Sequence, residues 1–239
     1  ELLDDYEDYL NRGTGRGQLG VVLEYIPCGR DELIDKLVGG YGDIVAAGMT
    51  ITPERSERAR FTIPYLTGIS EVLVTHRDVA APRTVEGLSG RSVHVRRSSS
   101  YHQSLESLNE RFAREGREQV DIVAVGEELE TEDILEMVNA GAIGMTVSDT
   151  HIAEIWGRLL DHIVIHDTVV LRPEVEIGWM VRRGNPELER SCNEFLRGRK
   201  RGTRLGNIYF NRYYRKTSWI SDPLGRSEEH TSELQSPSA

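Results

Sequence analysis

The sequence of 239 residues has no long apolar run and no surplus of basic residues. Because a membrane-spanning helix needs about 18 or more consecutive apolar residues, we expect no such helix here. The 29 Lys and Arg residues are outnumbered by 39 Asp and Glu residues, which gives a formal net charge of -10. This charge argues against nucleic acid as a partner, since its phosphates need basic residues to neutralise them. It still allows a local anion site made by a few well-placed donors.

Cysteine is scarce, and several common catalytic motifs are absent. Cys28 and Cys192 are too few for a disulfide framework and lack the spacing of metal ligands. We therefore expect both to be unpaired, small buried residues, and we expect no metal site. The sequence contains no G-x-S-x-G, H-E-x-x-H or phosphate-loop motif. We expect no catalytic residue and no cofactor, and we interpret His94, within a predicted strand, as a packed residue.

The last residues differ in character from the rest of the chain. "RSEEHTSELQS", residues 226–236, is polar, has no periodicity and follows a Pro-Leu-Gly break. It resembles the translation of a common sequencing-library adapter. We therefore leave 226–239 out of the functional reasoning as a non-native segment. On this interpretation the natural chain is expected to continue beyond the connector 206–225.

Strand and helix patterns alternate along the chain, which indicates an α/β fold. Helical patterns cover 2–10, 30–40, 127–141 and 185–198, and strand patterns cover 20–27, 42–48, 69–77, 92–95, 119–126, 161–171 and 174–184. The short, nearly all-apolar stretch 42–48 is typical of a buried strand in a parallel sheet. Polar turns join a strand to a helix twice, around 50–55 and around 98–101. This repetition favours two similar lobes that face a cleft, where open α/β sheets usually bind ligands.

Arg55 lies in the first turn of a predicted helix, where the backbone dipole already presents positive charge. Thr52 suits the N-cap and Pro53 the first helical position, and free backbone N–H groups at such a start attract anions. The guanidinium of Arg55 matches a carboxylate with two parallel donors. One interpretation is therefore an anion site. The other is a solvated surface charge paired with Glu54, Glu57 or another neighbour. We interpret Arg58 and Arg60 as ordinary surface residues.

Two further polar turns carry candidate site residues. Ser98, Ser99 and Ser100 offer hydroxyl and backbone N–H donors at a helix start, although plain N-capping needs only one serine. Asp149 stands between a predicted strand and a predicted helix. It is either an N-cap or a carboxylate that accepts hydrogen bonds from an ammonium or amide group of a ligand.

The stretch "GDIVAAGMTITPERSERARFTIPYLTG", residues 42–68, resembles the signature of the family 3 solute-binding proteins, which have the type II periplasmic binding protein fold. The resemblance implies a two-lobed fold with a ligand cleft, and it covers about 2–224. It places the ligand contacts on Gly48, Thr50, Arg55, Arg96, Ser100 and Asp149. Thr50 and Arg55 would hold an α-carboxylate, with the backbone of Gly48 nearby. Arg96 and Ser100 lie in the turn of lobe two, and Asp149 would hold an amino group.

The resemblance also implies limits for the lobes. Lobe one is expected at 1–66 and 176–205, and lobe two at 70–173, with crossings near 66–69 and 172–176. The first strand of lobe one would precede Glu1. Ser98–Ser100 replaces the glycine-bearing turn of amino-acid transport receptors, so their ligand specificity is not carried over.

Further stretches resemble the binding-protein-like N-terminal half of the membrane-bound lytic transglycosylase F family. They are "RRSSSYHQSLESLN", "VSDTHIAEI" and "RKRGTRLGNIYFNRYYRKTSWISDPL". The likeness implies a periplasmic sensor module attached to the outer membrane through its parent protein. The module would bind an amino acid or a peptidoglycan-derived peptide by lobe closure and regulate a covalently linked lytic domain.

Two rival functions stay open on the sequence. The first is a free receptor that delivers an amino acid to an ABC importer. The second is an enzyme on the same fold, such as a dehydratase of cyclic acids, for which Asp149 or Glu24 would have to supply the acid in the cleft.

Overall fold

The computed structural model describes residues 1–13 and 19–216. The segment 226–239 and the part of the connector beyond residue 216 lie outside this range. The helices are α1 (Leu2–Leu10), α2 (Leu33–Val38), α3 (Pro53–Arg58), α4 (Ser100–Arg114), α5 (Thr131–Asn139), α6 (Thr150–Trp156), α7 (Pro186–Arg197) and α8 (Arg204–Tyr214), with a 3-10 turn at Val85–Leu88. The strands are β1 (Ile44–Thr50), β2 (Arg60–Phe61), β3 (Leu66–His76), β4 (Ser92–Val95), β5 (Asp121–Ala124), β6 (Met145–Asp149) and β7 (Ile163–Val181).

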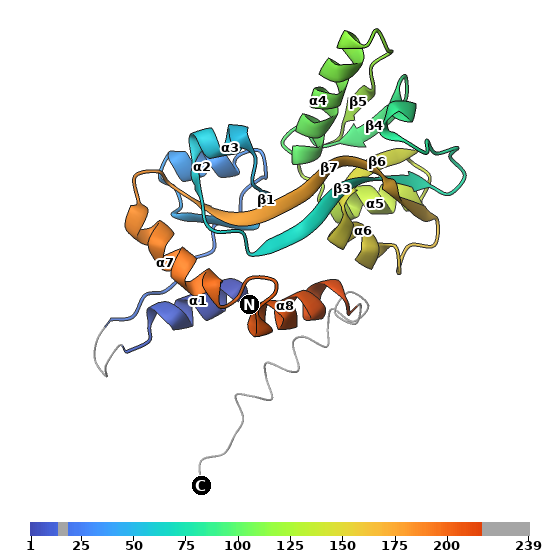
Figure 1. Ribbon diagram of the computed structural model, residues 1–239. Helices are drawn as coiled ribbons and strands as arrows, with labels where there is room; N and C mark the ends of the chain where they lie inside the picture. Colours follow the sequence, from blue (N-terminus) through green and yellow to red (C-terminus); the bar gives the residue numbers. More distant parts are fainter. Residues whose placement is uncertain (14–18, 217–239) are drawn as a thin grey trace.

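Two long strands, β3 and β7, join the two halves of the molecule (Figure 1). The strands lie in the order β1-β7-β3-β6-β4-β5, and β2 pairs with β7. We call the part with β1, β2, α1–α3 and α7 lobe one, and the part with β4–β6 and α4–α6 lobe two. Both expected crossings fall within β3 and β7, whereas the exact limits of the lobes stay a prediction.

Each lobe has its own buried core. In lobe two, Leu105 and Phe112 of α4 pack on Val93 and Val147 of the sheet, all at most 1% exposed. In lobe one, Tyr6 of α1 contacts the rings of Trp179 and Phe195 at centroid distances of 5.6 and 5.0 Å. The two cores are therefore separate clusters, one in each lobe.

Helix α1 and several caps form as the sequence predicts. The helical pattern at 2–10 matches α1, and the hydroxyl of Thr52 accepts a hydrogen bond from the backbone N–H of Arg55 at 3.3 Å. Asn185 caps α7 in the same way, through the backbone N–H of Leu188. Both cysteines are unpaired, but Cys28 is half-buried and only Cys192 is buried.

The predicted strand at 20–27 is wrong. Its backbone joins no strand ladder and instead bonds to side chains of the α1 region. The side chain of Asn11 exchanges two hydrogen bonds with the backbone of Val21, and Glu7 accepts from the N–H of Leu23. The segment has no pairing strand in the described part of the chain, and several of its apolar residues stay open to solvent, with Val22 80% exposed. Leu23 instead packs against the core of lobe one.

Two expectations about the central strands are also corrected. The patterns at 161–171 and 174–184 form one continuous strand, β7, although Pro173 lies within it. The ladder between β3 and β7 shifts register around this position, which accommodates the missing N–H of proline. Glu174 takes a positive φ of 52° at the same place. Strand β1 pairs antiparallel with β7, not in a parallel sheet, because β7 returns from lobe two beside it.

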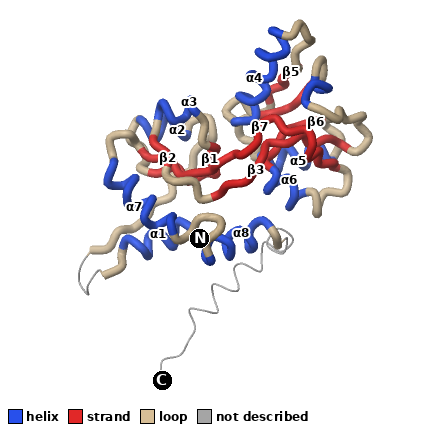
Figure 2. Tube along the Cα trace, viewed as in Figure 1, coloured by secondary structure: helices blue, strands red, loops and turns tan. Residues whose placement is uncertain are grey.

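Helix α8 lies across both lobes. Figures 1 and 2 show it running from beside α1 toward α6. The hydroxyl of Tyr209 in α8 donates a hydrogen bond to the carboxylate of Asp5 in α1. The guanidinium of Arg158, just after α6, donates a hydrogen bond to the carbonyl oxygen of Arg215 at 3.0 Å. The helix therefore contacts elements on either side of the two crossing strands.

Candidate functional site

A cavity of about 310 Å³ lies between the lobes. From lobe one it is lined by the end of β1 and by α3, and from lobe two by the N-terminal ends of α4, α5 and α6. All six residues that were predicted from the sequence as ligand contacts line this cavity: Gly48, Thr50, Arg55, Arg96, Ser100 and Asp149. The structure therefore brings together residues as far apart in the sequence as Gly48 and Asp149.

Gly48 shapes the lobe-one wall of the cavity. It has a positive φ of 64°, a conformation that glycine adopts without steric cost. The pairing of β1 with β7 is irregular between Val45 and Met49, so the glycine sits in a bulge. The bulge leaves the carbonyl oxygen of Ala47 to accept a hydrogen bond from Arg30 at 2.8 Å.

Arg55 is buried at the cavity, with 7% of its surface exposed. Its guanidinium donates to the carbonyl oxygens of Thr50 at 3.0 Å and Ser98 at 2.8 Å. Within the described residues it forms no salt bridge with Asp or Glu, so the interpretation as a paired surface charge is wrong. Burial lowers the pKa of Arg55 to about 10, because the charged form is poorly solvated there. An anionic group brought to this guanidinium would relieve that cost.

The surface interpretation holds for the other arginines of this stretch. Arg58 is exposed and pairs with Asp35, and Arg60 is exposed. Helix α3 itself has only six residues, and its Arg55 N–H is taken by Thr52. The guanidinium is therefore a stronger candidate for an anion contact in lobe one than the helix end is.

The three serines of the β4–α4 turn have three different roles. Ser99 caps α4 by accepting from the N–H of His102 at 3.2 Å. Ser98 binds Glu127 through its hydroxyl and backbone N–H, and its carbonyl oxygen accepts from Arg55. Ser100 donates to the hydroxyl of Thr50 at 3.2 Å, across the gap between the lobes. Only one serine is used as a cap, and all three line the cavity.

Asp149 occupies the N-cap position of α6 but makes no side-chain cap hydrogen bond. It is 4% exposed, and its Oδ1 is buried without a partner among the described residues. Strand pairing sets it directly opposite Glu71 of β3, which is fully buried. Burial, and then the charge of Glu71, raise the pKa of Asp149 to about 7. Such a carboxyl group is ready to accept a hydrogen bond from a cation.

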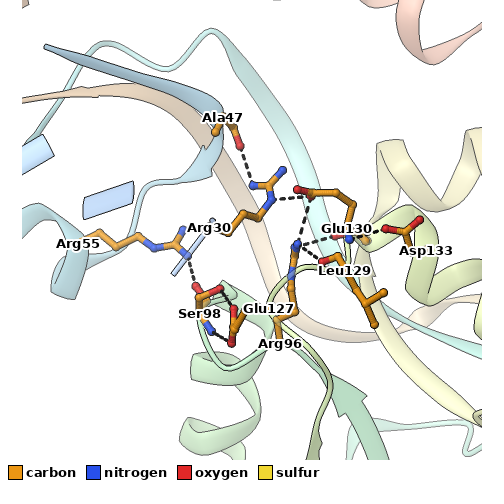
Figure 3. Close-up of polar contacts among 10 residues, drawn as sticks. Arg30, Ala47, Arg55, Arg96, Ser98, Glu127, Leu129, Glu130 and Asp133 are labelled. Atoms are coloured by element: carbon orange, nitrogen blue, oxygen red, sulfur yellow. Dashed lines mark hydrogen bonds and ion pairs between the residues drawn. The ribbon is translucent and has the colours of Figure 1, made fainter. Parts of the chain in front are cut away.

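Arg96 serves mainly to hold lobe two together. Its guanidinium donates hydrogen bonds to the carbonyl oxygen of Leu129 at 2.5 Å and to the carboxylate of Glu130 at 3.1 Å (Figure 3). It also donates one to the hydroxyl of Thr131 at 3.3 Å. These bonds fix the start of α5. Its Nε is buried without a partner. A direct contact of Arg96 with a ligand stays a prediction.

Arg30 is a lobe-one residue that was not predicted from the sequence as a site residue. It lines the cavity and donates from Nε to the carboxylate of Glu130 in lobe two at 2.6 Å. Figure 3 shows Arg30 and Arg96 converging on this carboxylate from opposite lobes, while Arg55, to their left, reaches Ser98. These bonds require the lobes to be close together.

Other cavity residues were also missed. His151 is buried, its ring lies edge-on to that of Tyr214 at 4.7 Å, and burial lowers its pKa to about 3, so it is neutral near pH 7. The remaining members include Tyr65, Tyr101, Thr131, Glu132 and Tyr214. Glu132 stands in the first turn of α5, where an acid is ordinary, so no sequence signal marked it. Tyr214 comes from α8, far away in the chain.

A second cavity of about 280 Å³ lies among α1, α8 and the sheet of lobe one, lined by Trp179, Phe210 and other aromatic residues. It shares only Ala46, Tyr65 and Tyr214 with the first cavity. Over residues 1–13 and 19–216, no group of three His, Cys, Asp or Glu side chains could hold a metal ion. The described part of the chain also has no helix that is long and apolar enough to span a bilayer.

Comparison with family models matches residues 16–215 to the bacterial extracellular solute-binding proteins, family 3. The chain belongs to this family. It is 35% identical over 199 residues to the membrane-bound lytic murein transglycosylase F of Desulfosudis oleivorans, which covers 83% of this chain and 41% of that relative. It is 30% identical over 185 residues to the membrane-bound lytic murein transglycosylase F 2 of Alkalilimnicola ehrlichii. That match covers 77% of this chain and 38% of the relative. The chain thus spans about two fifths of the length of these two relatives.

Solved structures of amino acid-binding proteins show the same fold. An ancestral arginine-binding protein bound to arginine has a TM-score of 0.69 at 23% identity and covers 89% of this chain and 87% of its own. An ancestral amino acid-binding protein described as a precursor of cyclohexadienyl dehydratase has a TM-score of 0.70 at 24% identity, covering 89% and 84%. The two-lobed α/β fold expected from the sequence is confirmed.

Proposed function

We propose that this chain binds a small zwitterion, an amino acid or a peptidoglycan-derived peptide, in the cavity between its lobes. One observation carries the proposal. The cavity holds a buried arginine without a carboxylate partner, Arg55, and a buried carboxyl oxygen without a donor, that of Asp149. A ligand with a carboxylate and an ammonium group supplies both missing partners.

The size of the cavity favours a small ligand. Its volume of about 310 Å³ is at the low end of the roughly 300–1,000 Å³ typical of ligand pockets. An amino acid, or the end of a short peptide, fits this space better than a long chain does. The bonds from Arg30 and Arg55 to lobe two support lobe closure as the binding motion, because opening the lobes would break them.

The similarity to lytic transglycosylase F relatives supports a role as the sensor module of a cell-wall protein of that kind. In this proposal the module acts in the periplasm, is attached to the outer membrane through its parent protein, and regulates a covalently linked lytic domain. Ligand binding would shift the population toward the closed form. The lytic activity would belong to the linked domain.

The main alternative is an amino-acid receptor of an ABC importer. It is favoured by likeness in fold to a solved amino acid ABC transporter substrate-binding protein and to a solved ABC transporter binding component. The full gene distinguishes the two: a lysozyme-like domain encoded after Leu224 supports the sensor, and a stop codon there supports the receptor. A dehydratase is less favoured, because Glu24 is exposed and does not line the cavity, which leaves Asp149 as the one acid proposed for it.

Isothermal titration calorimetry with free amino acids and muropeptides tests the proposal. We expect saturable 1:1 binding that Arg55→Ala weakens by about 2–5 kcal/mol, because a desolvated charged contact is lost. Arg58→Ala is the matched control, since Arg58 is exposed on the same helix and pairs with Asp35. Absence of binding across both panels by a folded protein would contradict the proposal, as would an Arg55→Ala variant that binds like the unmodified chain.

A further inference from the structure

Two buried acids lie side by side in neighbouring strands of the sheet. Strand pairing sets Glu71 of β3 directly opposite Asp149 of β6 and, on its other side, opposite Arg172 of β7. Side chains directly opposite each other in an antiparallel pair share one face of the sheet, with Cβ atoms about 5 Å apart. Glu71 is fully buried and Asp149 is 4% exposed. Bulk water therefore screens little of the repulsion between the two carboxyl groups.

Each of the two acids has one oxygen without a donor. The Oε1 atom of Glu71 and the Oδ1 atom of Asp149 are both buried and accept no hydrogen bond from the described residues. A buried acceptor without a donor is costly. One proton held between the two carboxyl groups would supply the hydrogen bond that both bare oxygens lack.

The contacts of Glu71 favour its charged form. Its Oε2 atom accepts a hydrogen bond from the hydroxyl of Ser104 in α4 and lies 3.9 Å from Nε of Arg172. Asp149 forms no salt bridge within the described part of the chain, and the nearby Arg55 donates to two carbonyl oxygens instead. The shared proton therefore resides mainly on Asp149.

The other titratable groups around the pair are neutral near pH 7. Burial is the first cause of the shift in the pKa of each: it raises the pKa of the tyrosines and lowers that of the histidine to about 3. The charged groups that face Asp149, besides Glu71, are Arg55 of α3 and Arg172 of β7, and both favour its ionised form. Burial and the charge of Glu71 outweigh them. The neutral groups are Tyr65, Tyr101 of α4, His151 of α6 and Tyr214 of α8.

We propose that Glu71 and Asp149 share one proton while the cavity is empty, and that the ammonium group of a bound ligand expels this proton to solvent. The inference rests on the proposed function, in which Asp149 holds the α-ammonium group. The O–H bond of the acid breaks, the proton passes to water, and an ammonium N–H becomes the new donor to Asp149. Glu71 does not line the cavity. It is a positioning residue, which sets how firmly Asp149 holds the proton that the ligand displaces.

An NMR pH titration of the Asp149 carboxyl carbon tests the shared proton without any ligand. In the unmodified chain we expect a midpoint near pH 7, the value set by the raised pKa of Asp149. Glu71→Gln keeps the shape of the side chain and removes its charge, so the midpoint should fall by about one pH unit or more. Glu136→Gln, which changes an exposed acid of α5, is the control and should leave the midpoint unchanged.

Ser104→Ala is the second variant, which carries the test if Glu71→Gln does not fold. It removes the hydroxyl that donates to Glu71, so Glu71 takes a larger share of the proton. The Asp149 midpoint should then fall by a smaller amount. A midpoint below about pH 5 in the unmodified chain overturns the shared proton, and so does a midpoint that both folded variants leave unchanged.

Calorimetry in buffers of different ionisation enthalpy counts the protons released on binding, with L-glutamine and the dipeptide Ala-Ala as probes. For a pKa of about 7 in the empty protein, we expect release of about 0.9 proton at pH 6 and about 0.1 at pH 8. Glu71→Gln should reduce the release at pH 6 to about half a proton or less. Binding without proton release at pH 6 overturns the coupling while the zwitterion site stands. No binding of either probe overturns the proposed function and with it the coupling, whereas the NMR midpoint still decides the shared proton.

Discussion

Replacing Asp149 with Asn should weaken ligand binding and at the same time stabilise the fold. Asp149 is 4% exposed, faces the buried Glu71 and has one oxygen without a partner. These surroundings raise its pKa from 3.8 to about 7. Because the folded protein then holds this proton more tightly than the unfolded chain, the group favours folding most at low pH. Its contribution is lost as the pH rises from about 4 to about 7.

The size of the effect follows from the pKa shift. A difference of about three pKa units corresponds to roughly 4 kcal/mol, of which more than half is lost between pH 5 and pH 8. Asn has nearly the same shape and does not ionise, so the variant avoids this loss. We therefore expect Asp149→Asn to be more stable than the unmodified chain at pH 8 by up to about 4 kcal/mol, with a smaller difference at pH 5.

Urea denaturation at pH 5 and pH 8, together with ligand titration, measures both effects. The variant should also bind the ligand at least about tenfold more weakly, because a neutral amide cannot pair with an ammonium group. A variant that is less stable at pH 8 and binds ligand normally would refute the reasoning. In that case Asp149 would be an ordinary structural acid.

Three further predictions follow from the same contacts. Ligand affinity should rise about tenfold from pH 6 to pH 8 as Asp149 ionises. His151 is already neutral in this range and does not contribute to the change. Calorimetry at three pH values checks this prediction, and an affinity that does not change with pH would contradict it. Arg30→Ala should weaken ligand binding only about two- to fivefold, because the half-exposed ion pair with Glu130 stabilises the closed lobes by less than about 1 kcal/mol. Small-angle scattering should show a larger radius of gyration for this variant, as expected for more open lobes. Thr52→Ala should lower the free energy of unfolding by about 1 kcal/mol through loss of the α3 cap, and urea denaturation without any change would argue against that cap.

Local signals predicted much of the fold. The helical period at 2–10, the Thr52 cap and the Asn185 cap depend on residues within one or two turns, and each forms as expected. The strand pattern at 20–27 failed because strand formation depends on a pairing partner as well as on composition. There the backbone bonds to Asn11 and Glu7 of the α1 region instead.

The candidate site was predicted unevenly for a similar reason. Arg55 and Asp149 follow recognisable strand–turn–helix patterns, so their place at one cavity could be inferred. Arg30 lies in an irregular stretch, and Glu132 looks like any acid at a helix start. Tyr214 reaches the cavity only because α8 folds back across both lobes. These three positions depend on tertiary packing, which no local pattern records.

A crystal structure of the chain with a bound amino acid is the most direct test of the account. We predict that the α-carboxylate of the ligand contacts the guanidinium of Arg55 and that its α-ammonium group contacts the carboxylate of Asp149. Ligand density in the aromatic cavity beside Trp179, with the space between the lobes unoccupied by it, would contradict the central claim.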